Sequence, residues 1–194
     1  LVYRKVEWDV QGETRGLRYG ENPQQEAALY KLEQGNLELG GVEYVGPDRG
    51  LVSDAQLLRA GKHPGKINLT DVDSALEILK HLDNEPATVI VKHNNPSGVS
   101  QKSALAESYE AAFQADPVAA FGGVIVCNRE LDTDTAERIT ERYAEVVAAP
   151  EYAEGSIDIL SRRKNIRLLR IPNIERLSEY RLLPYVDFHS LIDG

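Results

Sequence analysis

The sequence predicts an α/β fold, with a mostly parallel sheet in a three-layer α/β/α arrangement. Short apolar runs at residues 87–93, 123–127 and 166–171 fit strands that are covered on both faces. Segments with helical periodicity separate these runs. Strands that alternate with helices of this length form βαβ units, whose right-handed crossovers place helices on both faces of the sheet.

The first 66 residues are the least regular part of the sequence. Two glycines and a proline exclude regular structure across residues 16–25, and residues 35–65 are rich in glycine. We expect short strands in the second stretch, with a short helix over residues 53–60. Within one structural domain, we predict an N-terminal segment with a nucleotide-binding loop, an irregular elaboration and an α/β core, at residues 1–36, 37–66 and 67–194.

Helices and strands alternate more clearly after residue 66. Thr70 or Asp71 is the expected cap of a helix, because apolar residues follow at helical spacing as far as Leu82. Asp134 and Glu137 have the spacing of a capping pair for a later helix. The sequence further predicts helices at 103–115 and 153–163, a strand at 145–149, and a packed apolar tail at 178–194.

Composition excludes several classes of protein. The net charge of −9 over 194 residues argues against nonspecific binding to nucleic acid, which needs a basic face. No apolar run approaches the roughly 18 residues that cross a bilayer, so no membrane association is expected. The single cysteine, Cys127, fits a reducing cytoplasm, and a zinc site is improbable without paired His and Cys residues. Because the chain starts at Leu1 and contains no Met, we expect a fragment of a longer protein.

The first candidate site is the pair Lys92-His93, which follows the strand at 87–93. In α/β sheets ligands bind beyond the carboxyl ends of the strands, and we expect the pair there. Histidine is the usual general base in enzymes, so His93 is the candidate base, and Lys92 would place a cation beside it. Asn94 begins a polar loop whose amides could stabilise an oxyanion. The alternative is a strand end with a solvated Lys and a hydrogen-bonded His.

The second candidate is Arg18-Tyr19, within the loop at 16–25. The planar guanidinium of Arg18 matches phosphate oxygens, and Tyr19 could stack on a base or donate a hydrogen bond. Taken alone, a surface Arg beside a packing Tyr is the favoured interpretation.

Two further segments could approach a ligand. Phe121 and Gly122 lie in the sequence DPVAAFGG, where paired glycines allow close contact with the backbone. Glu145 precedes the strand at 145–149 and could bind ribose hydroxyls. An ordinary helix-to-strand turn and a plain strand start are the alternatives.

Together the motifs RYGENPQQ, DVDSAL, VKHNNPSGV, DPVAAFGG and VVAAP resemble AICAR transformylase in kind and order. This enzyme is the formyltransferase part of a bifunctional purine-biosynthesis family that also carries IMP cyclohydrolase. The resemblance covers most of residues 15–172 and corresponds to the N-terminal half of the transformylase. It implies two α/β subdomains that are similar to cytidine deaminase, without its zinc.

The resemblance also implies a reaction and roles for residues. The 5-amino group of AICAR attacks the formyl carbon of 10-formyltetrahydrofolate, with His93 as proton acceptor and Lys92 as transition-state stabiliser. Arg18 and Tyr19 would hold the nucleotide, Gly122 and Glu145 would lie along the ribose, and Asn94 and Phe121 would line the substrate. No metal is required. The resemblance implies a homodimer, a cyclohydrolase domain before this region, and a second transformylase subdomain that supplies much of the folate pocket.

Two other functions remain open from the sequence. One is a nucleotide-binding or assembly module that has no activity without a second half. The other is a different amine transferase that uses the Lys92-His93 pair on another phosphorylated amine.

Overall fold

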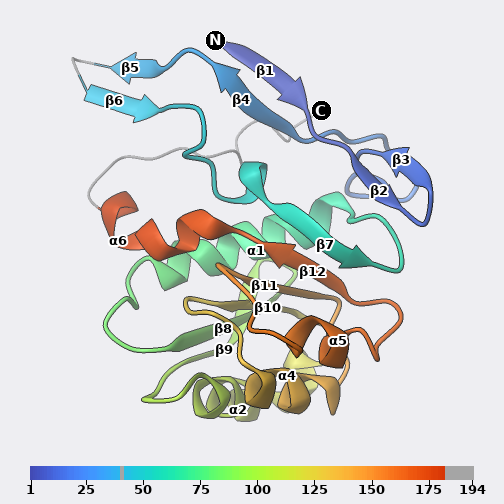
Figure 1. The fold of residues 1–194 in the computed structure, drawn as a ribbon, viewed down its shortest axis with the longest axis vertical. Coiled ribbons are helices and arrows are strands. Elements are labelled where there is room, and N and C mark those ends of the chain that lie inside the picture. Colours follow the sequence, from blue (N-terminus) through green and yellow to red (C-terminus); the bar gives the residue numbers. More distant parts are fainter. Residues whose placement is uncertain (40–41, 182–194) are drawn as a thin grey trace.

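The computed structural model describes residues 1–39 and 42–181, and its centre is a six-stranded sheet with helices on both faces (Figure 1). The predicted strands are confirmed, with shorter bounds than the sequence suggested. In spatial order the sheet contains β7 (Gln56–Ala60), β12 (Arg167–Arg170), β11 (Val146–Ala149), β10 (Val124–Cys127), β8 (Ala87–Lys92) and β9 (Asn95–Gln101).

The sheet is mixed, which corrects the prediction of a mostly parallel one. β10, β11 and β12 are parallel neighbours, whereas β8 is antiparallel to β10, β9 to β8, and β7 to β12. The antiparallel pairings arise because β8 returns directly into β9 through a tight turn instead of a helical crossover. The carboxyl end of β8 therefore lies beside the amino ends of β10–β12.

Alternation along the strands supplies an apolar surface to each face. Val89 and Val91 pack in one cluster with α1 (Lys66–Leu79), while Ile90 packs in a second cluster with the helices of the other face. Those helices are α2 (Leu105–Ala115), α4 (Thr133–Thr140) and α5 (Ser156–Leu160), and Figure 1 shows them across the sheet from α1. No helix among the described residues is long and apolar enough to cross a membrane.

Three two-stranded sheets precede the main sheet. They pair β1 (Val2–Lys5) with β4 (Tyr30–Gln34), β2 (Trp8–Val10) with β3 (Glu13–Arg15), and β5 (Leu37–Leu39) with β6 (Val42–Val45). The short helix predicted over residues 53–60 is wrong. A 3-10 turn, η1 (Val52–Asp54), leads instead into β7, which joins the main sheet although it lies in the segment that the sequence sets apart from the core.

Several helix boundaries differ from those predicted. Helix α1 starts at Lys66, so neither Thr70 nor Asp71 is its cap, and Asp132 rather than Asp134 caps α4 by accepting the Thr135 N–H at 2.7 Å. A short helix not predicted from the sequence, α3 (Pro117–Ala120), follows Asp116. The chain then ends its described part with η2 (Pro172–Arg176) and α6 (Leu177–Tyr180), and the predicted packing of residues 182–194 lies outside the described residues.

Candidate functional site

The first turns of α1 organise the candidate site through Asn68 and Asp71. These residues are three apart, so they lie on one side of the helix. The Asn68 amide accepts the Gly65 N–H at 3.0 Å and donates from Nδ2 to Glu145 Oε2 at 3.0 Å. Asp71 is only 5% exposed, and its carboxylate accepts backbone N–H groups from the turn after β8. One helix thus holds both Glu145 and the loop that carries the Lys-His motif.

The Lys92-His93 motif leads into a tight hairpin turn, and the residues predicted to form a polar loop after it lie mostly in β9. Lys92 pairs with Asn95 across the hairpin, and the two central residues, His93 and Asn94, have φ values of 54° and 60°. Positive φ at both centres is the geometry of a type I′ turn, which usually needs Asn or Gly. A histidine in this region is strained and persists where surrounding contacts hold it.

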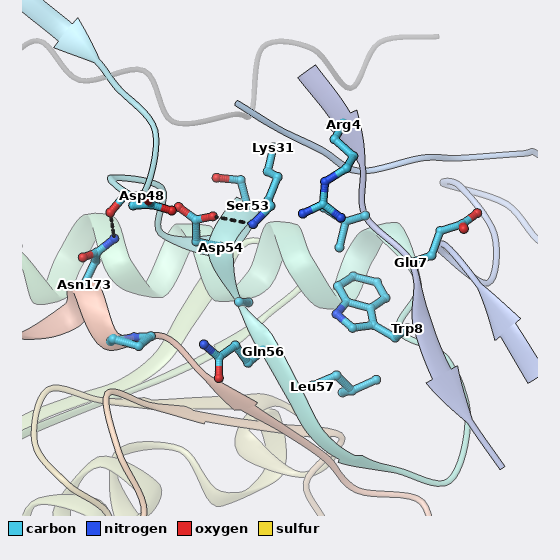
Figure 2. Close-up of a pocket in the computed structure, with 13 residues that line it drawn as sticks. Arg4, Glu7, Trp8, Lys31, Asp48, Ser53, Asp54, Gln56, Leu57 and Asn173 are labelled. Carbon is cyan, nitrogen blue, oxygen red and sulfur yellow. Dashed lines mark hydrogen bonds and ion pairs between the residues drawn. The ribbon is translucent and has the colours of Figure 1, made fainter. Parts of the chain in front are cut away.

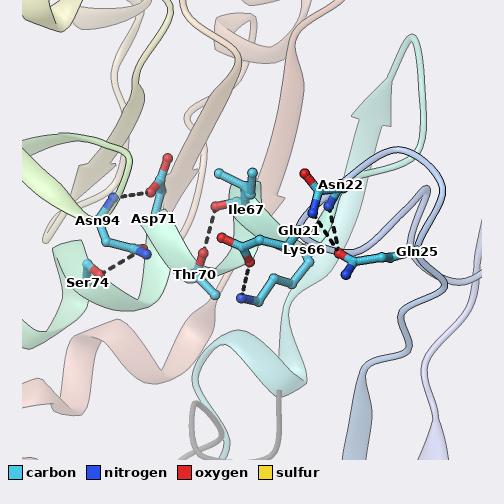
Figure 3. A network of polar contacts seen from close by, with 9 residues as sticks. All are labelled: Glu21, Asn22, Gln25, Lys66, Ile67, Thr70, Asp71, Ser74 and Asn94. Atoms are coloured by element: carbon cyan, nitrogen blue, oxygen red, sulfur yellow. Dashed lines mark hydrogen bonds and ion pairs between the residues drawn. The ribbon is translucent and has the colours of Figure 1, made fainter. Parts of the chain in front are cut away.

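Asp71 supplies those contacts. Its two oxygens accept the His93 N–H at 3.3 Å and the Asn94 N–H at 2.7 Å. Figure 3 shows the bond between Asp71 and Asn94. Burial raises the pKa of the Asp71 carboxyl, and the bonds from Asn94 and His93 oppose that rise. The His93 imidazole is exposed and makes no hydrogen bond to the described residues. The backbone of His93 is therefore fixed while its side chain stays available to a substrate.

The cation beside His93 is also positioned. Lys92 Nζ donates to the Phe121 carbonyl at 2.8 Å, and no carboxylate lies within 4 Å of it among the described residues. Phe121 is 57% exposed, and its ring lies 5.4 Å from that of Tyr143. Gly122 has φ of +73°, and its N–H donates to the Tyr143 carbonyl at 2.9 Å. Lys92 therefore connects the motif to Phe121 and Gly122, the segment in which the sequence predicted close contact between the backbone and a ligand.

The Arg18-Tyr19 loop lies against the start of α1. The Arg18 N–H donates to the Pro64 carbonyl at 2.8 Å, and the Lys66 N–H donates to the Tyr19 carbonyl at 3.1 Å. The Arg18 guanidinium lies 5.1 Å from the centre of the Tyr19 ring. Lys66 also pairs with Glu21, as Figure 3 shows. Residues far apart in sequence thus meet near Asn68, and the Asn68 amide connects them to Glu145.

The structure places these residues at the edge opposite to the one predicted. Because β8 runs against β10–β12, its carboxyl end meets their amino ends, where Gly122, Glu145 and Arg167 lie. The expected carboxyl edge of the parallel strands is therefore wrong for this motif. The antiparallel β7 also ends there, so its outgoing loop reaches the Arg18 segment.

Sequence reasoning missed three residues of this edge. Asp71 was expected as a helix cap, and Asn68 was not singled out. Arg167 is 7% exposed at the start of β12, and its Nε donates to the carbonyl oxygens of Lys62 at 3.1 Å and His63 at 3.4 Å. A charged residue directly before the apolar run Leu168-Leu169 was the available signal, since buried arginines are rare without a partner.

A cavity of about 560 Å³ lies at the other edge, beyond the carboxyl end of β12 (Figure 2). It contains none of the residues predicted for the site. Trp8 contributes an aromatic wall, and the two cations of the lining have carboxylate partners: Lys31 lies 3.6 Å from Asp54, and Arg4 lies 2.8 Å from Glu33. This cavity is thus not where the predicted site residues gather.

The described residues offer little to a metal or to thiol chemistry. Within residues 1–39 and 42–181, no three His, Cys, Asp or Glu side chains are grouped so that they could hold a metal ion. Cys127 is fully buried in β10, and burial raises the pKa of its thiol to about 12. A thiol buried in this way is unreactive.

Comparison with known proteins connects this chain with one family. The chain is 43% identical over 158 residues to the bifunctional purine biosynthesis protein PurH of Acetivibrio thermocellus, covering 81% of the chain and 28% of the relative. It is 37% identical over 194 residues to PurH of Oceanobacillus iheyensis, covering 100% of the chain and 34% of the relative. The chain therefore spans about a third of the length of these relatives.

Among solved structures, the dCMP deaminase of cyanophage S-TIM5 in its apo form matches at a TM-score of 0.40 and 11% identity. The match covers 53% of this chain and 95% of the deaminase. No conclusion on fold or activity follows from a match of this extent. The family model described as AICARFT/IMPCHase bienzyme matches residues 3–188. By that match and by the identity to its relatives, the chain belongs to the AICARFT/IMPCHase bienzyme family.

Proposed function

We propose that this chain carries the N-terminal half of an AICAR transformylase site, within an enzyme of purine biosynthesis. The enzyme would transfer a formyl group from 10-formyltetrahydrofolate to the 5-amino group of AICAR. Family membership supports the reaction class. The observation that carries the proposal is the His93–Asn94 turn, a strained backbone that buried Asp71 fixes beside Lys92.

The proposed step is a nucleophilic acyl transfer. The amine nitrogen of AICAR attacks the formyl carbon, so that a new C–N bond forms and the bond from that carbon to N10 of the folate breaks. His93 takes the proton that the amine loses and returns it to N10, which leaves as the N10–H amine of tetrahydrofolate. Such a base typically contributes about 10²- to 10⁴-fold in rate. The amine is a weak nucleophile because its lone pair is delocalised, so holding both substrates close supplies a further part.

The remaining residues have binding roles in this proposal. Lys92, fixed through the Phe121 carbonyl, stabilises negative charge on the formyl oxygen. Arg18 binds the phosphate and Tyr19 the nucleotide, while Gly122 and Glu145 lie along the ribose. The Asn94 side chain, 3.3 Å from the Ser74 hydroxyl, and the exposed Phe121 ring line the substrate.

The proposal has further parts. They are a deaminase-like, three-layer arrangement without zinc, a homodimer, a cytoplasmic location and a folate pocket that a second subdomain completes. The domain boundaries predicted from the sequence also stay predictions.

The direct test is a transfer assay on the 194-residue chain at high protein concentration. Tetrahydrofolate release from AICAR and 10-formyltetrahydrofolate is followed, with IMP formation measured in parallel. The informative variant is His93→Asn, because Asn tolerates positive φ and removes the base without straining the turn. We expect at least a hundredfold loss of turnover, and no loss for the matched control His81→Asn, which is exposed after α1.

Three outcomes separate the candidate functions. Turnover that survives in His93→Asn would remove His93 from the proposed role. AICAR binding without turnover by the wild-type chain would favour the assembly module, which an added second half should activate. Binding of other phosphorylated amines in preference to AICAR would favour a different transferase.

A further inference from the structure

Arg167 is a buried cation that the proposed function does not use. It is the first residue of β12, and only 7% of it is exposed. Its neighbours Ile166 and Leu168 are fully buried in the apolar cluster below the sheet. In the part of the chain that the structure describes, the side chain is hydrogen-bonded only through Nε, to the Lys62 and His63 carbonyls at 3.1 and 3.4 Å. These bonds fix the side chain against the loop that follows β7.

The outer part of the guanidinium lacks such partners. Among the described residues, neither η nitrogen of Arg167 donates a hydrogen bond, and no carboxylate lies within 4 Å. Glu145 is near enough to influence it, but the Glu145 carboxylate is bonded to Asn68 instead. Burying a charge without a counter-ion is costly, so a counter-ion from outside the chain would stabilise this arrangement.

Arg18 is held by the same loop. Its N–H donates to the Pro64 carbonyl, the next carbonyl after the two that hold Arg167. The Arg18 side chain also has no carboxylate within 4 Å among the described residues. Burial lowers the pKa of Arg167, Glu145 opposes this, and the positive charge of Arg18 adds to the lowering. The loop thus brings together two cations that repel each other in the absence of an anion.

We infer that Arg167 is a second phosphate-binding residue, which acts with Arg18 on the 5′-phosphate of the nucleotide. Two planar guanidinium groups can together give a phosphate dianion several charge-assisted hydrogen bonds. The bound phosphate would supply the counter-charge that both arginines lack. This inference rests on the proposed function for the identity of the nucleotide, whereas the anion site itself does not depend on the transfer reaction.

The test compares ligands that differ in the phosphate. Ribose 5-phosphate, AICAR and its nucleoside are titrated into the 194-residue chain by calorimetry. Arg167→Gln should lower the affinity for ribose 5-phosphate and for AICAR at least tenfold and leave the affinity for the nucleoside unchanged. Arg18→Gln should have the same effects. Arg176→Gln is the matched control, because Arg176 is an exposed cation paired with Glu179 after β12. We expect it to change nothing.

Arg167→Lys keeps the charge but not the fork, and it should recover part of the lost phosphate affinity. It also carries the test if Arg167→Gln does not fold. An equal loss for nucleoside and nucleotide would overturn the inference, because Arg167 would then act by positioning Glu145. Unchanged affinities, or no binding of millimolar ribose 5-phosphate by the wild-type chain, would also overturn it.

The transfer assay separates this inference from the proposed function. Phosphate esters that bind through Arg167 without any formyl transfer would defeat the proposed function alone. Transfer with an unchanged KM for AICAR in Arg167→Gln would defeat the role of Arg167 alone.

Discussion

The two edges of the six-stranded sheet differ in how their charges are satisfied. At the carboxyl end of β12 a cavity of about 560 Å³ is lined by cations that have carboxylate partners, such as Lys31 with Asp54. At the amino ends of β10–β12, Lys66 pairs with Glu21, but Lys92, Arg18 and Arg167 have no carboxylate within 4 Å among the described residues. The contacts of these three side chains are with backbone carbonyls or an aromatic ring.

This difference indicates which edge of the sheet is the better candidate for a ligand site. The cavity favours the first edge, and so does the general rule for α/β sheets. The second edge has positive groups that the described chain does not neutralise, together with a strained turn held by a buried carboxylate. Unsatisfied charge beside fixed backbone is the stronger indication, because a structural role would not require it.

The largest expected effect on stability comes from Gly98, in the hairpin behind His93. A Cβ at this position would lie 1.8 Å from the Ala112 carbonyl oxygen of α2. Gly98→Ala should therefore push β9 away from α2 and lower the free energy of unfolding by about 3 kcal/mol in urea denaturation. Val99→Ala, at an exposed neighbour, should cost much less. Equal costs would mean that α2 yields easily and does not fix the hairpin.

A smaller effect is expected from Asp71→Ala, which leaves the N–H groups of His93 and Asn94 without their acceptor. The turn is exposed, so water replaces part of the lost bonding, and we expect a loss of about 1–3 kcal/mol. The loss should depend on pH. Since the pKa of Asp71 is raised in the folded state, the wild type binds its proton more tightly when folded.

Wild-type stability relative to Asp71→Ala should therefore be greatest below the ordinary pKa of 3.8 and fall as pH rises through the raised pKa. Urea denaturation of both proteins from pH 3.5 to 8 (roughly the span over which an Asp with a raised pKa titrates) measures this difference. A difference that is constant with pH would show that Asp71 ionises as in the unfolded chain.

The smallest effect belongs to the cavity edge. Lys31 and Asp54 are 3.6 Å apart, and their side chains are 29% and 17% exposed. Lys31→Gln should change the free energy of unfolding by about 0.5 kcal/mol and leave AICAR affinity unchanged, since partly solvated pairs contribute little. Weakened AICAR binding in Lys31→Gln would contradict the assignment of the ligand site to the other edge, because the cavity would then take part in nucleotide binding.

The sequence predicted the strands well because their residues are buried on both faces. Val89, Ile90 and Val91 are all fully buried, so a continuous apolar run was a sufficient signal. It did not predict strand direction. The turn has Asn94 at one centre but His93 at the other and contains no glycine, so the usual Asn-Gly signal was absent and the start of β9 was expected as a loop. The predicted edge of the sheet was wrong for that reason.

The site was predicted in part for a similar reason. Lys92, Arg18 and Gly122 lie in loops, where local sequence patterns are visible. Asn68, Asp71 and Arg167 lie within regular elements, and their roles depend on contacts with residues 22 to 105 positions away. Periodicity assigns such residues to a helix or strand and carries no information on which distant partner they meet.

Helix α1 also sets a length scale within the site. Asn68 and Asp71 are three residues apart, which is about 4.5 Å of rise, and this interval relates Glu145 to the His93 turn. Inserting one residue between them would rotate one contact by about 100° around the helix axis relative to the other. Under the proposed function, Glu145 at the ribose and His93 at the amine would then no longer face the same nucleotide, although every side chain is still present.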